Sequence, residues 1–219
     1  MRAGVITFPG SNCDRDAAVA LAACGAAVTS IWHAETELPR LDLIVLPGGF
    51  TYGDYLRCGA IAARAPVMAE VVRRAEAGVA VLGICNGFQI LAEVGLLPGA
   101  MISNAGLKFI CRPVDLEVAT DASIFTAGYA RGQAISLPIA HHDGNYVSSE
   151  GERKRLEDQD RIAFRYVGNP NGSTGRIAGV LGAGRNVLGM MPHPERAAEP
   201  RLGGTDGRIL FETLIEALG

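Results

Sequence analysis

The chain has 219 residues, of which 48% are hydrophobic and 20% are charged, and its formal net charge is −3 at pH 7. This composition is ordinary for a globular protein with a packed core, and the length suits one domain covering residues 1–219. The small negative charge argues against binding to nucleic acid or to an anionic membrane, because either partner requires a basic surplus or a basic stripe.

The thiols and the apolar segments indicate the compartment. No apolar stretch approaches the ~20 residues needed to span a bilayer, and the first residues lead straight into a strand-like run without a signal segment. The five cysteines form an odd set without a C-x-x-C pair: Cys13, Cys24, Cys58, Cys85 and Cys111. We therefore expect reduced thiols, a cytoplasmic protein and neither a disulfide framework nor a zinc site.

The first half of the chain alternates short apolar runs with helical ones. Strands are expected at Gly4–Phe8, Ala27–Trp32, Leu43–Leu46 and Val79–Ile84. Helices are expected at Asp14–Cys24, at Asn86–Glu93, and after the glycines near residue 48, where Pro66–Ala77 is either the end of one helix or a separate helix. This alternation predicts a three-layer α/β fold, in which a mainly parallel central sheet has helices on both faces.

The second half has shorter strand-like runs separated by polar or glycine-rich turns. They are Leu116–Ala119, Gln133–Pro138, Arg161–Val167, Ile177–Leu181 and Asn186–Met190. We expect either an antiparallel extension or the far side of the same sheet. The charged run Glu150–Asp160 is expected to be a solvated turn or a short helix, and an amphipathic helix near Gly207–Leu218 closes the chain.

The stretch Gly83-Ile84-Cys85-Asn86-Gly87 has the G-x-nucleophile-x-G form of a nucleophile elbow. A sharp turn between a strand and a helix holds the nucleophile clear of the sheet, and the flanking glycines avoid side-chain clashes. The helix N-terminus behind Cys85 favours a thiolate. Buried cysteines are also common in cores, so packing is the alternative interpretation; for Cys13, Cys24, Cys58 and Cys111 it is the one we prefer.

A second stretch, Met191-Pro192-His193-Pro194-Glu195, supplies a base. Histidine exchanges protons near neutral pH, and in extended backbone a carboxylate two residues later reaches the same side. The prolines keep the segment out of a helix. His193 is thus a candidate base and Glu195 the group that orients it, although an exposed proline-rich loop would read the same way.

Paired glycines after the third strand suggest an oxyanion hole. In Pro47-Gly48-Gly49-Phe50 the backbone N–H groups can face a ligand at the carboxyl edge of the sheet. This turn would then form one side of the oxyanion hole, completed by the N–H of Asn86. A simple tight turn is the alternative, and the phosphate-loop pattern G-x-x-x-x-G-K-[ST] does not occur.

Together these motifs resemble the class I (triad) glutamine amidotransferases, a flavodoxin-like α/β family. Within it the chain is most similar to the glutaminase subunits of phosphoribosylformylglycinamidine synthase, an enzyme of purine biosynthesis. The resemblance covers nearly the whole chain and is carried by Phe8–Asp14, Gly49–Asp54, Gly83–Gln89, Leu137–His141, Asn169–Ser173 and Gly189–Arg196. It implies that Cys85, His193 and Glu195 form a catalytic triad that releases ammonia from glutamine.

The resemblance also implies the rest of the site and the partners. Gly49 and Asn86 would supply the oxyanion N–H groups, and Gln89 would contact the substrate glutamine. No metal or organic cofactor is expected in this chain, since ATP and magnesium would bind a large synthetase subunit that assembles with it and with a small bridging subunit. One departure is Asp143, where the family leads us to expect Glu, and His141 and His142 beside it are candidates for a role at the site or the interface.

Three alternatives stay open from the sequence. The same chemistry could serve another synthetase, such as one that makes GMP or carbamoyl phosphate. A cysteine hydrolase or peptidase of a related α/β family would carry a similar elbow, but usually with histidine directly after the cysteine, where this chain has Asn86. A binding module that had lost catalysis would be expected to lack Cys85 or His193.

Overall fold

The computed structural model describes residues 1–55 and 57–219, and within them one large sheet organises the chain. Nine strands pair side by side in the described part of the chain. In spatial order they are β2 (Ala27–Trp32), β1 (Arg2–Thr7), β3 (Leu43–Leu46), β4 (Ala80–Ile84), β11 (Val187–Met190), β10 (Ile177–Leu181), β9 (Ile162–Tyr166), β6 (Ile110–Val118) and β7 (Ala134–His141). A separate antiparallel pair joins β5 (Ala100–Ile102) to β8 (Asn145–Val147).

The two halves of the sheet are built differently. β2, β1, β3, β4 and β11 pair in parallel, whereas β10, β9, β6 and β7 continue the sheet through antiparallel pairs. The predicted parallel sheet is confirmed. Of the two alternatives for the second half of the chain, β10, β9, β6 and β7 form the antiparallel extension, whereas β11 joins the parallel part. Buried strands such as β3 and β4 are apolar throughout, as strands covered on both faces must be.

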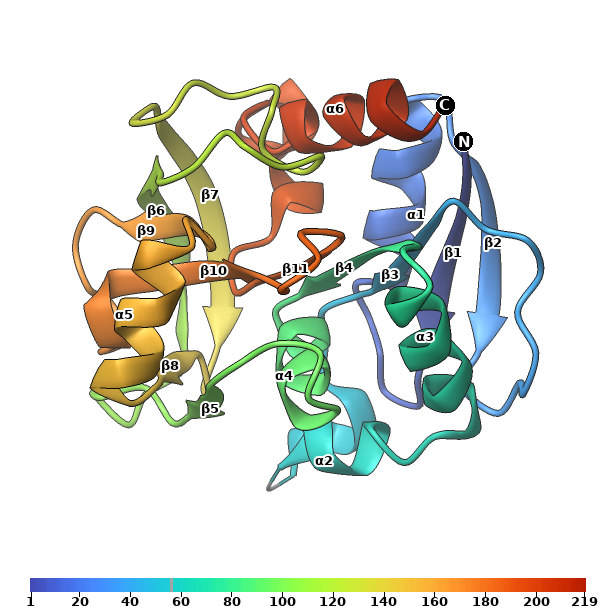
Figure 1. The fold of residues 1–219 in the computed structure, drawn as a ribbon, viewed down its shortest axis with the longest axis horizontal. Coiled ribbons are helices and arrows are strands. Elements are labelled where there is room, and N and C mark those ends of the chain that lie inside the picture. The colour runs from blue at the N-terminus through green and yellow to red at the C-terminus, as the bar shows by residue number, and fades with distance from the viewer. Residues whose placement is uncertain (56) are drawn as a thin grey trace.

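Helices cover both faces of the parallel part (Figure 1). α1 and α6 contact each other on one side, while α4 packs beneath β3, β4 and β11 with α2 against it. Their bounds are α1 Asp14–Ala23, α2 Cys58–Ala62, α3 Pro66–Glu76, α4 Asn86–Glu93, α5 Glu150–Asp158 and α6 Arg208–Leu218. The predicted α/β architecture with helices on both faces is thus confirmed, and α3 is a separate helix.

The segment between β3 and α3 is more broken than expected. A 3-10 turn at Thr51–Asp54 contains positive φ at Tyr52 and Gly53, and α2 follows it before α3 begins at Pro66. The side chain of Cys58, which we expected to pack in the core, lies outside the described residues. Further 3-10 turns occupy Thr174–Arg176, Pro194–Ala197 and Pro200–Leu202.

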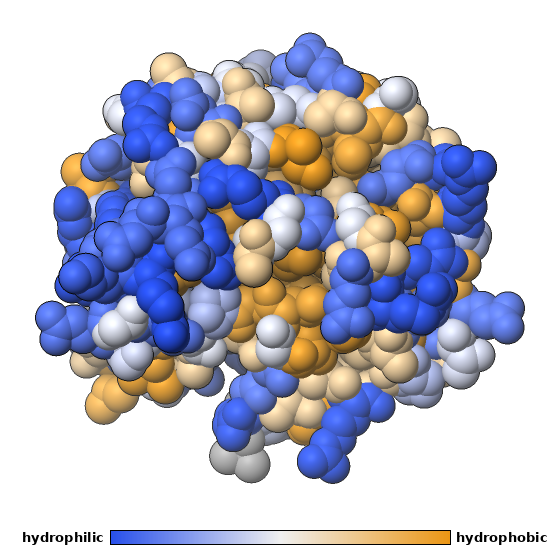
Figure 2. Space-filling view, viewed as in Figure 1, coloured by the Kyte–Doolittle hydropathy of each residue, from blue (hydrophilic) through white to orange (hydrophobic). Residues whose placement is uncertain are grey.

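The charged run at 150–160 forms a short helix. Ser149 caps α5, because its hydroxyl accepts a hydrogen bond from the N–H of Glu152 at 3.2 Å, and Glu150 and Glu152 in the first turn suit the helix dipole. Leu156 is the buried residue of this helix. Figure 2 shows charged side chains gathered over α5 at the left, and apolar ones nearer the centre of the same face.

Three strand ends meet at one edge of the sheet. In the parallel ladders Leu46 pairs with Gly83, and Ile84 pairs with Met190. The segments that follow β3, β4 and β11 therefore leave the sheet side by side. This edge is where open α/β sheets bind ligands.

Within residues 1–55 and 57–219, no helix combines the length and the apolar character that crossing a bilayer requires.

Candidate active site

Cys85 occupies a strained turn between β4 and α4. Its φ of 50° and ψ of −104° lie outside the regions that non-glycine residues favour. The turn is tied to the neighbouring strand, because the N–H of Cys85 donates to the carbonyl of Met190 at 2.7 Å. Its thiol lies 3.7 Å from the carbonyl oxygen of Ala140 on β7, and the residue is 4% exposed. This is the geometry of a nucleophile elbow.

The glycines on either side of Cys85 are required by close contacts. A β-carbon on Gly87 would collide with the backbone carbonyl of Leu46 in β3. The first turn of α4 can therefore lie against that strand only because residue 87 is glycine. A β-carbon on Gly83 would lie 2.7 Å from the carbonyl oxygen of Gly87. The predicted reason for the G-x-C-x-G pattern is therefore met by contacts of this structure.

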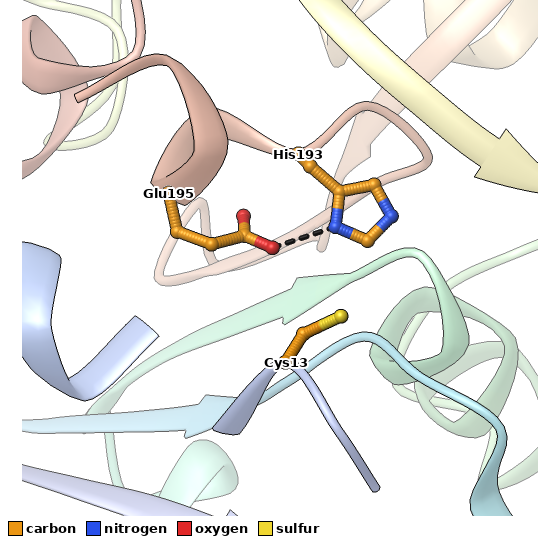
Figure 3. Close-up of side chains that lie close together, drawn as sticks. All are labelled: Cys13, His193 and Glu195. Carbon is orange, nitrogen blue, oxygen red and sulfur yellow. Dashed lines mark hydrogen bonds and ion pairs between the residues drawn. The ribbon is translucent and has the colours of Figure 1, made fainter. Parts of the chain in front are cut away.

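His193 and Glu195 form a buried pair beyond the end of β11 (Figure 3). The His193 Nδ1 and Glu195 Oε1 atoms are 2.6 Å apart, and the two side chains are 2% and 0% exposed. The backbone N–H of His193 donates to the carbonyl of Pro138 on β7 at 2.8 Å. Glu195 thus fixes the orientation of the ring, while Nε2 has no hydrogen-bond partner among the described residues.

The environment of His193 favours its protonated form. Burial alone lowers the pKa of His193, but the Glu195 carboxylate, together with the sulphurs of Cys85 and Cys13, raises that pKa well above its ordinary value. A protonated imidazole beside Cys85 stabilises a thiolate. The pair can therefore prepare a nucleophile and afterwards supply a proton.

Gly48 lies where the three segments meet. A β-carbon at Gly48 would be 2.6 Å from His193 Cε1 and 3.3 Å from Cys85 Cβ. From the sequence, Gly49 was the expected oxyanion residue of this pair, and the proximity of Gly48 to Cys85 and His193 was not expected. Gly49 has a φ of 133°, which favours glycine, and forms a bridge with Ser11. Asn86 is the first residue of α4, so the two expected oxyanion residues follow the ends of adjacent strands.

Gln89 lies one helical turn into α4 at a cavity of about 150 Å³. Its amide nitrogen donates to the backbone carbonyl of Asp143 at 2.8 Å, and its amide oxygen accepts from Asn86 Nδ2 at 2.6 Å. Asp143 lines the same cavity, and its carboxylate accepts a hydrogen bond from Ser103 Oγ at 2.8 Å. The shorter acid at 143 therefore has a defined partner at the rim of the cavity.

The other three histidines, His33, His141 and His142, differ in burial and in their contacts. His141 on β7 is 3% exposed, and its Nδ1 lies 3.0 Å from Asn104 Oδ1. Burial, with a smaller contribution from His193, lowers the pKa of His141 to about 4, so this ring is neutral at neutral pH. His142 is half-exposed and contacts Asp143 at 2.7 Å. His33 contacts the Tyr52 hydroxyl at 3.1 Å.

Cys13 has contacts beyond the packing role that was expected for it. It was expected only to pack, and it is indeed buried. However, its sulphur lies within 4.8 Å of ligand atoms of both His193 and Glu195 (Figure 3). The signal that could have found it is its place directly before a helix, inside the motif Phe8–Asp14 that the resemblance already singled out.

The fold and the site together define a class I glutamine amidotransferase. A model of the CobB/CobQ-like glutamine amidotransferase domain matches residues 1–202. A protein of Cereibacter sphaeroides named phosphoribosylformylglycinamidine synthase subunit PurQ is 61% identical over 216 residues, which cover 98% of this chain and 97% of that protein. A PurQ subunit of Roseobacter denitrificans is 59% identical, covering 100% of this chain and 99% of its own length.

Among solved structures, a chain of PurLQS from Thermotoga maritima superposes with a TM-score of 0.92 at 46% identity, covering 100% of this chain and 99% of that chain. The chain therefore belongs to the PurQ family of glutamine amidotransferase subunits.

Proposed function

We propose that this protein is the glutaminase subunit of phosphoribosylformylglycinamidine synthase, which hydrolyses glutamine to glutamate and ammonia for purine biosynthesis. The observation that carries the proposal is the buried His193–Glu195 pair, 2.6 Å apart, which lies beyond the end of β11, next to the strand β4 that leads into the strained Cys85. Full-length similarity to PurQ subunits supports the same activity.

The reaction is assigned to three side chains. The Cys85 thiolate attacks the side-chain amide carbon of glutamine and forms a C–S bond. Protonated His193 gives its proton to the amide nitrogen, the C–N bond breaks, and ammonia leaves a glutamyl thioester. Neutral His193 then takes a proton from water, whose oxygen attacks the thioester carbon. The C–S bond breaks and restores the thiolate, His193 keeps the proton taken from water, and the new carboxyl group loses its proton to solvent as glutamate leaves.

Backbone donors and Gln89 complete the proposed site. The N–H groups of Gly49 and Asn86 stabilise the negative charge that develops on the carbonyl oxygen; loss of one such donor typically costs about 10²–10³ in rate. Gln89 contacts the substrate from the wall of the cavity, where its own amide is held between Asn86 and Asp143. Cys85 does not itself line this cavity, but it precedes α4 one helical turn before Gln89, so we propose that the substrate extends from the cavity toward the elbow.

The partners follow from the chemistry that this chain does not perform. Ammonia must be consumed by a synthetase, and we assign ATP and magnesium to a large synthetase subunit, with a small bridging subunit completing the complex. The similar chain from Thermotoga maritima belongs to a structure of PurLQS, and that name supports such an assembly. We propose that residues 1–219 act as one amidotransferase domain in the cytoplasm, where the free thiols of Cys13, Cys24, Cys85 and Cys111 stay reduced.

The test is glutamate release from glutamine by this chain, alone and with the cognate synthetase, ATP and formylglycinamide ribonucleotide. Strong stimulation by the synthetase mixture supports both the chemistry and the partner. Activity without stimulation keeps the glutaminase and favours the runner-up, a glutaminase that serves another synthetase. No glutamate in either mixture would contradict the proposal.

A further inference from the structure

The sulphur of Cys13 has polar partners on two sides. Arg196 Nη2 donates a hydrogen bond to it at 3.0 Å, and the thiol itself faces Asn12 Oδ1 at 3.7 Å. The guanidinium of Arg196 also reaches Asp16 on α1, with 3.4 Å between Nε and Oδ2. Since Arg196 directly follows Glu195, these contacts attach the turn that carries the His193–Glu195 pair to the start of α1.

The residues next to Cys13 hold the opposite side of the site. Ser11 forms a bridge with Gly49, and the N–H of Cys13 points to the carbonyl of Gly48 at 3.4 Å. A β-carbon on Gly49 would lie 2.6 Å from Asn12 Oδ1, so Asn12 packs directly against that glycine. The segment Ser11–Cys13 therefore contacts the glycine turn after β3 and, through Cys13, the turn after β11.

We propose that Cys13, together with Arg196, is a positioning residue for the glutamine hydrolysis proposed above, and that it fixes the His193–Glu195 pair relative to the Gly48–Gly49 turn. This inference rests on the proposed function. Cys13 touches neither the substrate nor the reacting atoms in this assignment, and it acts through Arg196 and through the histidine.

The same cluster also has the composition of a zinc site, because a thiolate, an imidazole and a carboxylate lie within 4.8 Å of one another. The guanidinium of Arg196 against the sulphur already supplies positive charge at that place. A metal cation would have to sit beside this fixed charge, so the cluster fits a hydrogen-bonded positioning role better than a metal site.

The electrostatics give the positioning role a measurable signature. Burial lowers the pKa of His193, whereas Glu195, Cys85 and Cys13 raise it, and His141 on β7 faces it as a neutral ring. Removing the Cys13 sulphur takes away one of the contributions that favour protonated His193. The alkaline limb of the pH–rate profile, which reports loss of that proton, should therefore move to lower pH.

The experiment compares Cys13→Ala with Cys24→Ala in the assembled synthetase complex. Cys24 is the matched control, because it ends the same helix, is only partly buried and lies at the opposite end from the site. We expect Cys13→Ala to lower kcat for glutamine on the order of 10-fold, which is less than the roughly 100-fold that a misplacement near 1 Å can cost, because Cys13 acts only through its neighbours. The KM for glutamine and the ammonia-dependent synthesis should stay near those of Cys24→Ala, and the alkaline limb should shift downward only in Cys13→Ala.

A conservative variant separates positioning from simple packing. In Cys13→Ser the hydroxyl can accept from Arg196 and donate to Asn12, so much of the lost kcat should return. If Cys13→Ala does not fold, the pH–rate profile of Cys13→Ser is the measurement that tests the proposal. Identical kcat and pH profiles for the Cys13 variants and Cys24→Ala would overturn the proposal, as would a loss of kcat without any movement of the alkaline limb.

Failure of the proposed function gives a different result. If the wild-type complex releases no glutamate, the rate at which iodoacetamide alkylates Cys85, followed by peptide mass spectrometry, still reports how His193 activates the thiol. A slower, pH-shifted alkylation of Cys85 in Cys13→Ala than in Cys24→Ala then supports the positioning role. Equal alkylation profiles would overturn it.

Discussion

Gly48 touches His193 so closely that a β-carbon at position 48 would lie 2.6 Å from Cε1 of the imidazole. The same carbon would be 3.3 Å from Cβ of Cys85. Cys85 and His193 therefore both lie next to Gly48, a residue without a side chain. This contact makes the glycine after Pro47 a requirement of the site as well as of the turn.

Gly48→Ala should displace His193 and lower glutamine-dependent synthesis by about 100-fold, since a misplacement near 1 Å can cost that much. Ammonia-dependent synthesis by the complex should persist. The matched control is Gly151→Ala in α5, where a β-carbon meets nothing within 4 Å. Equal glutamine use by the two variants would show that the ring accommodates the methyl group.

Cys85→Ala should abolish glutamine-dependent synthesis, because no thioester can form, and leave ammonia-dependent synthesis intact. The measurement is product formation by the reconstituted complex with glutamine or with ammonium salt as the nitrogen source. Cys111→Ala, at an exposed cysteine, is the control. Retained glutamine use by Cys85→Ala would contradict the assignment of the nucleophile.

His141 should make stability depend on pH in the acid range. The pKa of His141 is lowered from 6.5 to about 4, so the unfolded chain binds the proton more readily than the folded one. The stability that the neutral ring contributes is present above pH 6.5 and is lost as the pH falls toward 4. The loss is on the order of 3 kcal/mol when complete.

His141→Gln should therefore show a smaller fall in the free energy of unfolding than wild type between pH 6.5 and 4, as measured by urea denaturation across that range. His142→Gln changes the neighbouring, half-exposed histidine and is the control. If the wild-type protein and His141→Gln lose stability in parallel, another group must dominate the acid range.

Ser149→Ala should destabilise the protein by about 1 kcal/mol, the usual value of an N-cap hydrogen bond. The hydroxyl of Ser149 accepts from the N–H of Glu152 at 3.2 Å. In Figure 1 α5 lies at the left, whereas α4, which directly follows Cys85, lies at the centre. Denaturant unfolding should show the loss, while glutamine hydrolysis stays at the wild-type rate. Ser149→Asp, which restores a capping acceptor, should recover the stability.

The parallel half of the fold could be predicted from the sequence because its signals are local. Strand β3 and the helix Asp14–Ala23 occur where the apolar runs placed them, and the G-x-C-x-G pattern located the turn at Cys85. The first part of β6 was missed, since Pro113 and charged residues interrupt its apolar pattern. In the ladders of the described residues the β9 partner begins at Leu116, so Pro113 lies where β6 pairs with β7 alone, and such an unpaired edge tolerates proline.

The contacts of Cys13 could not be predicted in this way. Its hydrogen-bond donor, Arg196, is 183 positions away in the sequence, and neither residue carries a periodic pattern that points to the other. The same holds for Gly48, whose contact with His193 exists only because β11 pairs beside β4. Local sequence patterns pointed to Cys85 and His193. The neighbours Gly48 and Cys13 could not be found in this way, because the order of strands in the sheet brings them to the site.

The position of β11 also determines when the protein can become active during its synthesis. β11 lies between β4 and β10, although it is the last strand of the chain. While a ribosome is still translating the middle of the chain, Cys85 has already been made but His193 has not. A growing chain therefore cannot bring His193 beside Cys85 until residues 193–195 have emerged and β11 has entered the sheet.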